Sequence, residues 1–142
     1  MSQIAGIYDA LAAMKVGSAE LTATDITDVK LIPILDKDLP KRLLMPLTEG
    51  DMEYAMIGNL QTVTWGIQDL CLFAPSTSNF GIHQYSGEML TYIGDYLTAV
   101  KAIKSPVAGC VITGVSFRMV PVLWGEKTYW SVDTTLAVEE RI

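Results

Sequence analysis

The stretch from Val63 to Val100 constrains the fold of this chain more than any other part of the sequence. Apolar residues alternate with others from Val63 to Phe73, which is the period of a β-strand with one buried face. Leu70 and Leu72 place apolar side chains on the opposite face, so the end of this strand is predicted to be covered on both sides. A polar loop follows, and then an amphipathic helix from about Tyr85 to Val100. A strand that leads into a long helix is a packing unit, which favours a scaffold for contacts with other proteins.

Asp69 breaks the pattern because it falls on the apolar face of this strand. An unpaired buried charge is very costly, so we expect Asp69 to pair with a cation or a hydrogen-bond donor, or to face a boundary between subunits. Arg118, in the middle of a candidate neighbouring strand, is the candidate cation. An acid–base pair of Asp69 with Glu88 is a weaker interpretation than this structural one.

The first half of the chain divides into elements by its periodicity. Spacings of three and four between apolar residues predict a helix from about Gln3 to Lys15. The apolar run from Val29 to Leu35 predicts an edge strand or a bulged one, because Pro33 cannot donate to a ladder. The segment from Asp36 to Asp51 is predicted to be an irregular crossing between strands, with a turn of helix around Lys41 to Met45.

The end of the chain predicts a β-hairpin. Two alternating segments, Cys110–Leu123 and Tyr129–Glu140, are joined by a turn at Gly125–Lys127. In the first segment, Val111 and Leu123 are expected on the apolar face. The whole order predicts a single domain, residues 1–142, of the α+β class: a mostly antiparallel sheet with two helices packed on one face.

Composition narrows the classes of function. Half of the 142 residues are hydrophobic and only 18% are charged, so apolar surface is expected to remain for a partner. The net charge of -6 and the absence of a basic run argue against free binding to nucleic acid. Neither a secretory signal nor an apolar run of membrane-spanning length is recognisable. Cys71 and Cys110 lie in apolar runs and are predicted to be buried free thiols, as in a protein made in a reducing cytoplasm.

Catalytic chemistry has little support in the sequence. A single histidine, His83, and two separated cysteines do not form a metal cluster. His83 is also the only histidine that could serve as the base of a hydrolase, and it lies in a polar loop. No glycine motif has the spacing of a phosphate cradle. We therefore expect no catalytic, metal or cofactor residues.

Several segments together resemble a known family. They are Leu39-Pro40-Lys41-Arg42-Leu43-Leu44-Met45-Pro46, Trp65-Gly66-Ile67-Gln68-Asp69-Leu70, Tyr92-x-x-x-Tyr96-Leu97, and a final hairpin that ends near Val138-Glu139-Glu140. In this order, after a short N-terminal helix, the chain resembles the small tail terminator (tail completion) proteins of long, non-contractile-tailed bacteriophages. The resemblance covers nearly the full chain and rests on order, length and the Trp-x-Ile-x-Asp-Leu-like strand.

The resemblance implies a structural role without enzymatic activity. Such proteins form a six-membered ring on the end of the tail tube, stop tube growth, and join the tail to the head connector. The expected location is the head-proximal end of the tail in the virion, after assembly in the host cytoplasm. The expected partners are further copies of the chain, the tail tube protein, and the head–tail connector or stopper protein. An acidic ring would let DNA pass through its lumen without specific binding, and no membrane is involved.

The expected contact surfaces come from loops and strand edges. The polar loop from Pro75 to Gln84 carries a lone aromatic residue, and we expect it to contact a neighbouring subunit or the tube; the alternative is that its Phe80 folds back on its own core. Free edges are expected at Val29–Leu35 and Thr134–Ile142, as sites for strand addition. The candidate interface residues are Phe80, His83, Asn79, Asp69, Arg118, Val138 and Glu140.

Two other interpretations remain open. One is a different neck protein, for head completion or as a stopper, whose fold is usually a small β-barrel. The other is a small cytosolic α+β domain that binds a ligand or acts as an enzyme. A concave pocket with converging polar groups would distinguish the latter.

Overall fold

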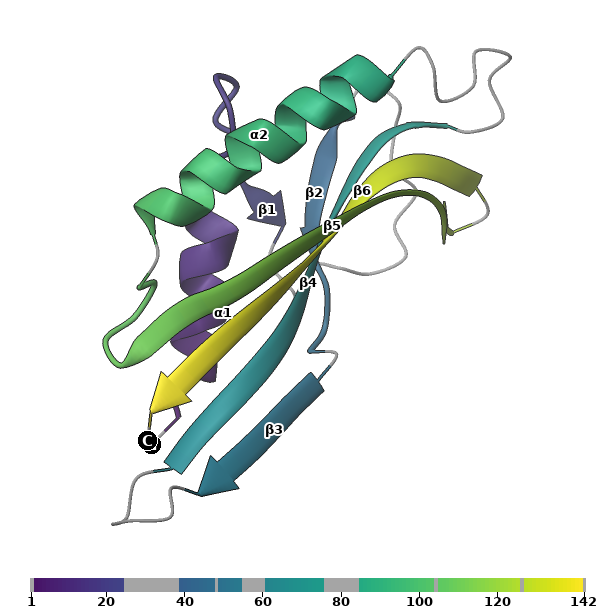
Figure 1. The fold of residues 1–142 in the computed structure, drawn as a ribbon. Helices are drawn as coiled ribbons and strands as arrows, with labels where there is room; N and C mark the ends of the chain where they lie inside the picture. Colours follow the sequence, from purple (N-terminus) through teal and green to yellow (C-terminus); the bar gives the residue numbers. More distant parts are fainter. Residues whose placement is uncertain are drawn as a thin grey trace.

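One mixed sheet with two helices forms the part of the chain that the computed structural model describes, which comprises residues 2–24, 39–47, 49–54, 61–75, 85–103, 105–125 and 127–141 (Figure 1). The elements are α1 (Ile4–Ala13), β1 (Ala23–Thr24), β2 (Lys41–Leu44), β3 (Glu49–Tyr54), β4 (Gln61–Pro75), α2 (Ser86–Ala102), β5 (Cys110–Trp124) and β6 (Lys127–Arg141). The predicted α+β class is therefore confirmed, as are both helices, the central strand and the C-terminal hairpin.

Two long strands, β4 and β6, form the middle of the sheet. The order is β1-β2-β4-β6-β5, and β3 pairs with the first part of β4. All these pairs are antiparallel except β1 with β2. The sheet is thus mostly antiparallel, as the alternating strand patterns predict.

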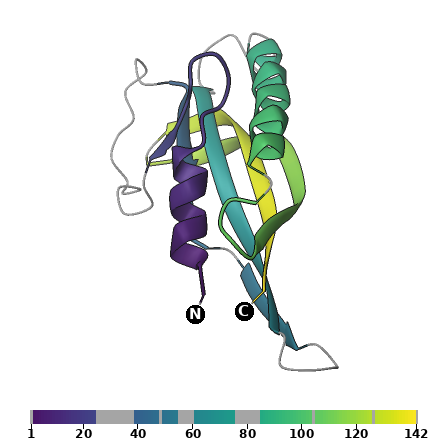
Figure 2. The same ribbon diagram turned by 90° about the vertical axis from the view of Figure 1, so that its left-hand side faces the viewer.

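Both helices cover the same face of the sheet (Figures 1 and 2). Period-2 alternation places one set of side chains on that face, and it packs against the apolar stripes of α1 and α2. The fully buried members of this main core include Ile7, Leu11, Ile67, Met89, Tyr96, Val132, Leu136 and Val138. The predicted packing of two helices on one face is confirmed, and this face holds most of the polar groups described below.

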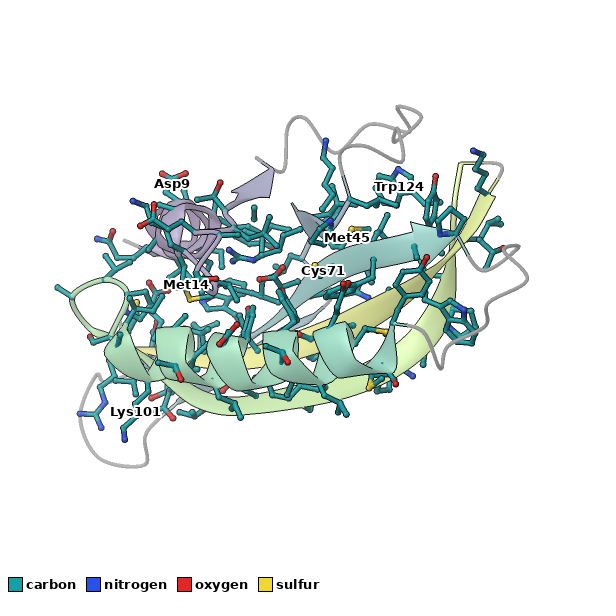
Figure 3. The ribbon with its side chains drawn as sticks, turned by 90° about the horizontal axis from the view of Figure 1, so that it is seen from above. Asp9, Met14, Met45, Cys71, Lys101 and Trp124 are labelled. Carbon is teal, nitrogen blue, oxygen red and sulfur yellow. The ribbon has the colours of Figure 1, made fainter. Side chains whose placement is uncertain are left out.

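The opposite face has a smaller core where the sheet curls at the β5–β6 hairpin. Leu70 and Leu72 of β4 pack there with Trp124 and Tyr129 of the hairpin and with Leu43 of β2. Figure 3 shows Trp124 near the hairpin end, far from α1. The prediction that the end of the central strand is covered on both sides is confirmed.

Three sequence predictions about the strands are wrong. Lys41–Leu44 is a strand rather than a turn of helix, because it pairs with Leu72–Asp69 of β4. Glu49–Tyr54 is not part of an irregular crossing, since it forms a hairpin partner for β4. The segment from Thr134 to Arg141 is not a free edge, because β6 is paired with β4 on one side and β5 on the other.

The register of β5 differs from simple alternation. It shifts between Ile112 and Gly114, so Ile112 is buried and Val111 is largely exposed. Leu123, expected on the apolar face, is exposed at the curled end of the hairpin. The expected edge strand Val29–Leu35 lies outside the described residues.

Candidate functional site

Arg42 is the centre of a buried polar network under the two helices. Strand β2 holds it opposite Cys71 of β4, on the helix-covered face, and its side chain is fully buried. Its Nη1 donates to the carbonyl oxygens of Met14 at 2.6 Å and Leu21 at 3.2 Å, and its Nη2 donates to the carbonyl oxygen of Leu11 at 2.6 Å. The last carbonyls of a helix have no intrahelical donor, so Arg42 caps the C-terminal end of α1.

Asp69 is the charged partner of Arg42. Arg42 Nε donates to Asp69 Oδ2 at 2.8 Å, and the hydroxyl of Tyr96 donates to the same oxygen at 2.7 Å. The guanidinium carbon also lies 5.7 Å from the centre of the Tyr96 ring, within the range of a cation–π contact. One network therefore connects α1, Leu21 just before β1, β2, β4 and α2.

The partner predicted for Asp69 is wrong, although its buried place on the apolar face is confirmed. Arg118 lies on β5, and β6 separates β5 from β4. Arg118 faces the other side of the sheet, where its Nη2 bonds Asp133 Oδ2 at 2.8 Å. The alternative in which Asp69 faces a subunit boundary is wrong as well, because its side chain is fully buried within its own chain.

The electrostatics of this network suit a structural role. Burial raises the pKa of Asp69, and the charge of Arg42 together with the hydroxyl of Tyr96 opposes that rise. Burial also raises the pKa of Tyr96 well above its ordinary value. All three side chains are buried completely, so no substrate can reach them in this conformation. The network fixes elements relative to one another.

Glu140 performs a second fixing role at the start of α1. Its carboxylate accepts hydrogen bonds from the Ser2 hydroxyl at 2.8 Å, from the Gln3 amide, and from Trp65 Nε1 at 3.3 Å. Although burial alone would raise the pKa of Glu140, these donors and the Cys110 thiol lower it below the ordinary value. Glu140 thus ties the beginning of α1 to the end of β6 and to β4.

Val138 and Glu140 are not interface residues of the folded subunit, contrary to the sequence prediction. Val138 is fully buried, and Glu140 is 1% exposed. The reason is the central place of β6, whose helix-side residues lie under α1 and α2. The other expected contact residues, Asn79, Phe80 and His83, lie outside the described residues.

The two cysteines are free and buried, as predicted. Burial, with the nearby Asp69 charge, raises the pKa of the Cys71 thiol far above its ordinary value. Burial and Glu140 raise the pKa of the Cys110 thiol. The thiolate is the reactive form of cysteine, so neither side chain is set up as a nucleophile.

A groove with a volume of about 780 Å³ lies between α2 and the turn that follows α1. Its lining includes Phe73 and Tyr92 on the floor, and Glu88 and Asp95 along α2.

Within the described ranges, no group of three or more histidine, cysteine or carboxylate residues could hold a metal ion. No described helix is both long and apolar enough to cross a membrane.

The surface on the other side of α2 is apolar and open. Leu90 and Leu97 are among the most exposed large apolar side chains of the described residues, and β5 beside them ends the sheet.

Sequence comparison adds no relative to this picture. No model of a known protein family matches the chain, and no curated protein matches it in sequence.

Proposed function

We propose that this chain is a structural protein of a bacteriophage virion, a tail terminator that forms a ring on the end of the tail tube. In this role it ends polymerisation of the tube and joins the tail to the head connector. The partners are other copies of the chain, the tail tube protein and a connector or stopper protein. DNA passes through the lumen without specific binding, and the chain carries no enzymatic activity.

One observation carries the proposal: the segments that resemble tail terminators form the structural centre of the fold. Trp65–Leu70 lies in the central strand β4. Tyr92 and Tyr96 of α2 pack over this strand in the main core, and Asp69 bonds Tyr96 directly. The residues behind the resemblance therefore belong to one connected unit.

The open sheet also favours this proposal over another neck protein. A head-completion or stopper protein is expected to be a small β-barrel, whereas the described sheet ends at β5 and carries two helices on one face. Barrels remove their edges by closure, and open sheets keep them. A ring subunit needs two unlike faces that match each other, and open edges can supply them.

The test combines native mass spectrometry with negative-stain imaging of the purified full chain. We expect closed six-membered rings, formed alone or when polymerising tail tube protein of a long non-contractile-tailed phage is added. With tube protein present, tubes should be shorter and closed by a ring at one end. A stable monomer that leaves tube length unchanged, or a dimeric or five-membered assembly on the tube end, contradicts the proposal.

A small ligand-binding domain is the competing function, and the groove beside α2 is the observation that favours it. Its volume falls within the usual range of ligand pockets, about 300–1,000 Å³. The same imaging separates the two functions, since a ligand-binding monomer should form no rings.

A further inference from the structure

The groove between α2 and the turn that follows α1, which we call the α2 groove, has an apolar floor (Figure 2). Phe73 and Tyr92 form this floor, and their rings pack edge to face with 5.4 Å between their centroids. Val16 and Leu21 of the turn line the same space. The volume of about 780 Å³ is within the range of sites for small molecules. The groove therefore offers a small molecule a continuous apolar surface.

The charged side chains in the lining of the α2 groove are both carboxylates, Glu88 and Asp95 of α2. They stand seven residues apart in the sequence, which is two helical turns and about 10 Å along the helix axis. Residues at this spacing share one side of a helix. A carboxylate therefore lies toward each end of the apolar floor.

Gly17 allows the Asp95 carboxylate to lie against the turn. The backbone of Gly17 has a φ of +75°, and a Cβ atom placed there would be 3.0 Å from Asp95 Oδ2. Any larger residue would therefore press on this carboxylate. Asp95 thus marks the end of the groove where the helix and the turn come closest.

Neither carboxylate has a partner among the described residues. Glu88 and Asp95 take part in none of the ion pairs or hydrogen bonds there. Lys15 comes just before the turn that lines the groove, but its ammonium group lies 3.6 Å from Glu20. Two unpaired negative charges beside an apolar floor complement a ligand that is apolar in the middle and positively charged at its ends.

We propose that the α2 groove binds an aliphatic molecule with an ammonium group at each end, a linear diamine. Its methylene chain covers Phe73 and Tyr92, where each buried methylene group strengthens binding. Its two ammonium groups meet Glu88 and Asp95 and donate hydrogen bonds to them. This site is separate from the subunit contacts of the proposed ring, and the inference does not depend on that ring.

The groove suits a methylene chain better than an extended peptide. A buried peptide needs partners for its own N–H and C=O groups. In the turn, Val16 and Leu21 exchange backbone hydrogen bonds, and the Glu20 amide donates to the Gly17 carbonyl oxygen. The backbone groups of α2 bond within the helix. Because a methylene chain has no such groups to satisfy, we assign the groove to a small molecule.

Titration of the ¹⁵N-labelled full chain with linear diamines, followed by NMR, tests the site. The probes are diaminobutane, diaminohexane and diaminooctane with terminal amines, and octanediol is the uncharged control. We expect affinity to rise by up to about fourfold for each added methylene group, until the ligand reaches both carboxylates. The shifted amide signals should include those of Gly17 and of residues 88–95. Octanediol should bind more weakly than diaminooctane.

Substitutions in the groove test the role of the two carboxylates. Glu88→Gln and Asp95→Asn should each weaken the binding of diaminooctane by roughly fivefold. Asp9→Asn is the matched control, because Asp9 is exposed on α1 and does not line the groove. It removes the same charge and should leave the affinity unchanged. All three variants should keep the melting temperature, since neither groove carboxylate has a partner to lose.

Other results overturn the inference. If affinity does not depend on chain length and Asp9→Asn weakens binding as much as Asp95→Asn, the diamines respond only to the net charge of -6. If octanediol binds as tightly as diaminooctane, the carboxylates do not select the ligand. If no diamine shifts the groove signals, the groove does not bind this class of molecule. None of these results bears on ring formation, which imaging tests separately.

Discussion

The Arg42 network and the outer edge of β5 differ in how their polar groups find partners. Around Arg42, three backbone carbonyls, a carboxylate and a tyrosine hydroxyl meet inside the main core. Along β5, the outer backbone groups meet no described strand, and neighbouring leucines remain exposed. The first region is paired within its own chain, Asp69 Oδ1 excepted, whereas the outer side of β5 has no partner strand among the described residues.

This difference indicates which of the two regions holds the fold together. The Arg42 side chain, from β2, contacts α1, β4 and Tyr96 of α2 at once, and removing one partner of a buried ion pair is strongly destabilising. Changes in the network should therefore act mainly on the free energy of unfolding.

The largest effect on stability is expected from Arg42→Met. The substitution keeps much of the side-chain volume but leaves the Asp69 carboxylate buried without its cation. Breaking a buried ion pair in this way costs about 3–5 kcal/mol, to be measured by urea unfolding followed by tryptophan fluorescence. Without Arg42, burial is left to raise the pKa of Asp69. The variant should therefore be least destabilised at acid pH, where Asp69 is neutral, and lose stability as pH rises.

The matched control combines Arg42→Met with Asp69→Asn. Removing the charge of residue 69 while keeping its shape and an acceptor for Tyr96 should recover part of the loss, with a coupling of about 1–3 kcal/mol. Asp69→Asn alone should cost about 1–3 kcal/mol. Strictly additive losses in the double variant would show that the two side chains do not depend on each other.

Much of the fold follows from periodicity in the sequence. The alternation in β4 and β6 and the helical spacing in α2 are strong because one face of each element is buried. Strand β3 was missed because half of its residues are acidic, and pairing with β4 outweighs their low strand propensity. Strand β2 escapes prediction for a different reason: its four residues are too few to show a period, and pairing with β4 decides their structure.

Only part of the buried network around Asp69 can be predicted from the sequence. Asp69 on an apolar face signalled a buried pair, but residue type alone could not choose between arginines. The alternation of Arg42 with Leu44 is a usable signal, because residues two apart in a strand share a face. Leu44 pairs with Asp69, so Arg42 lies on the same face of the sheet as Asp69. Strand order eliminates Arg118, and a sequence does not state strand order. Nothing in the residues around Glu140 signals that its carboxylate meets the start of α1.

A smaller effect, dependent on pH, is expected from Glu140→Gln. Hydrogen bonds lower the pKa of Glu140 in the folded chain below its ordinary value of 4.5, so the ionised form stabilises the fold. That contribution is fully present above the ordinary pKa and is lost as pH falls through the lower folded pKa. At pH 7 the variant should lose about 1–3 kcal/mol, and the difference from the unmodified chain should shrink below pH 4.5.

Glu139→Gln removes the same charge from the neighbouring position and is the control for Glu140→Gln. Residue 139 pairs with Thr64 of β4 and lies on the other face of β6, away from the start of α1. The difference in unfolding free energy between this variant and the unmodified chain should stay small from pH 3 to pH 7, roughly within 0.5 kcal/mol. Equal pH profiles for the two variants would contradict a special role for Glu140 and would point to net charge alone.

The smallest effect is expected from Arg118→Ala, and it sharpens the contrast with Arg42. Both arginines bond a carboxylate at 2.8 Å, but the Arg118 side chain is 71% exposed whereas that of Arg42 is fully buried. Only the Arg118 end of this pair lies in water, since the Asp133 side chain is 5% exposed, and pairs at the surface contribute about 0.2–1 kcal/mol. Asp133 also keeps a hydrogen bond from Gln68 at 2.9 Å. Urea unfolding should therefore show a loss of at most about 1 kcal/mol, further reduced by salt. A loss as large as that of Arg42→Met would mean that geometry, and not burial, sets the strength of these pairs.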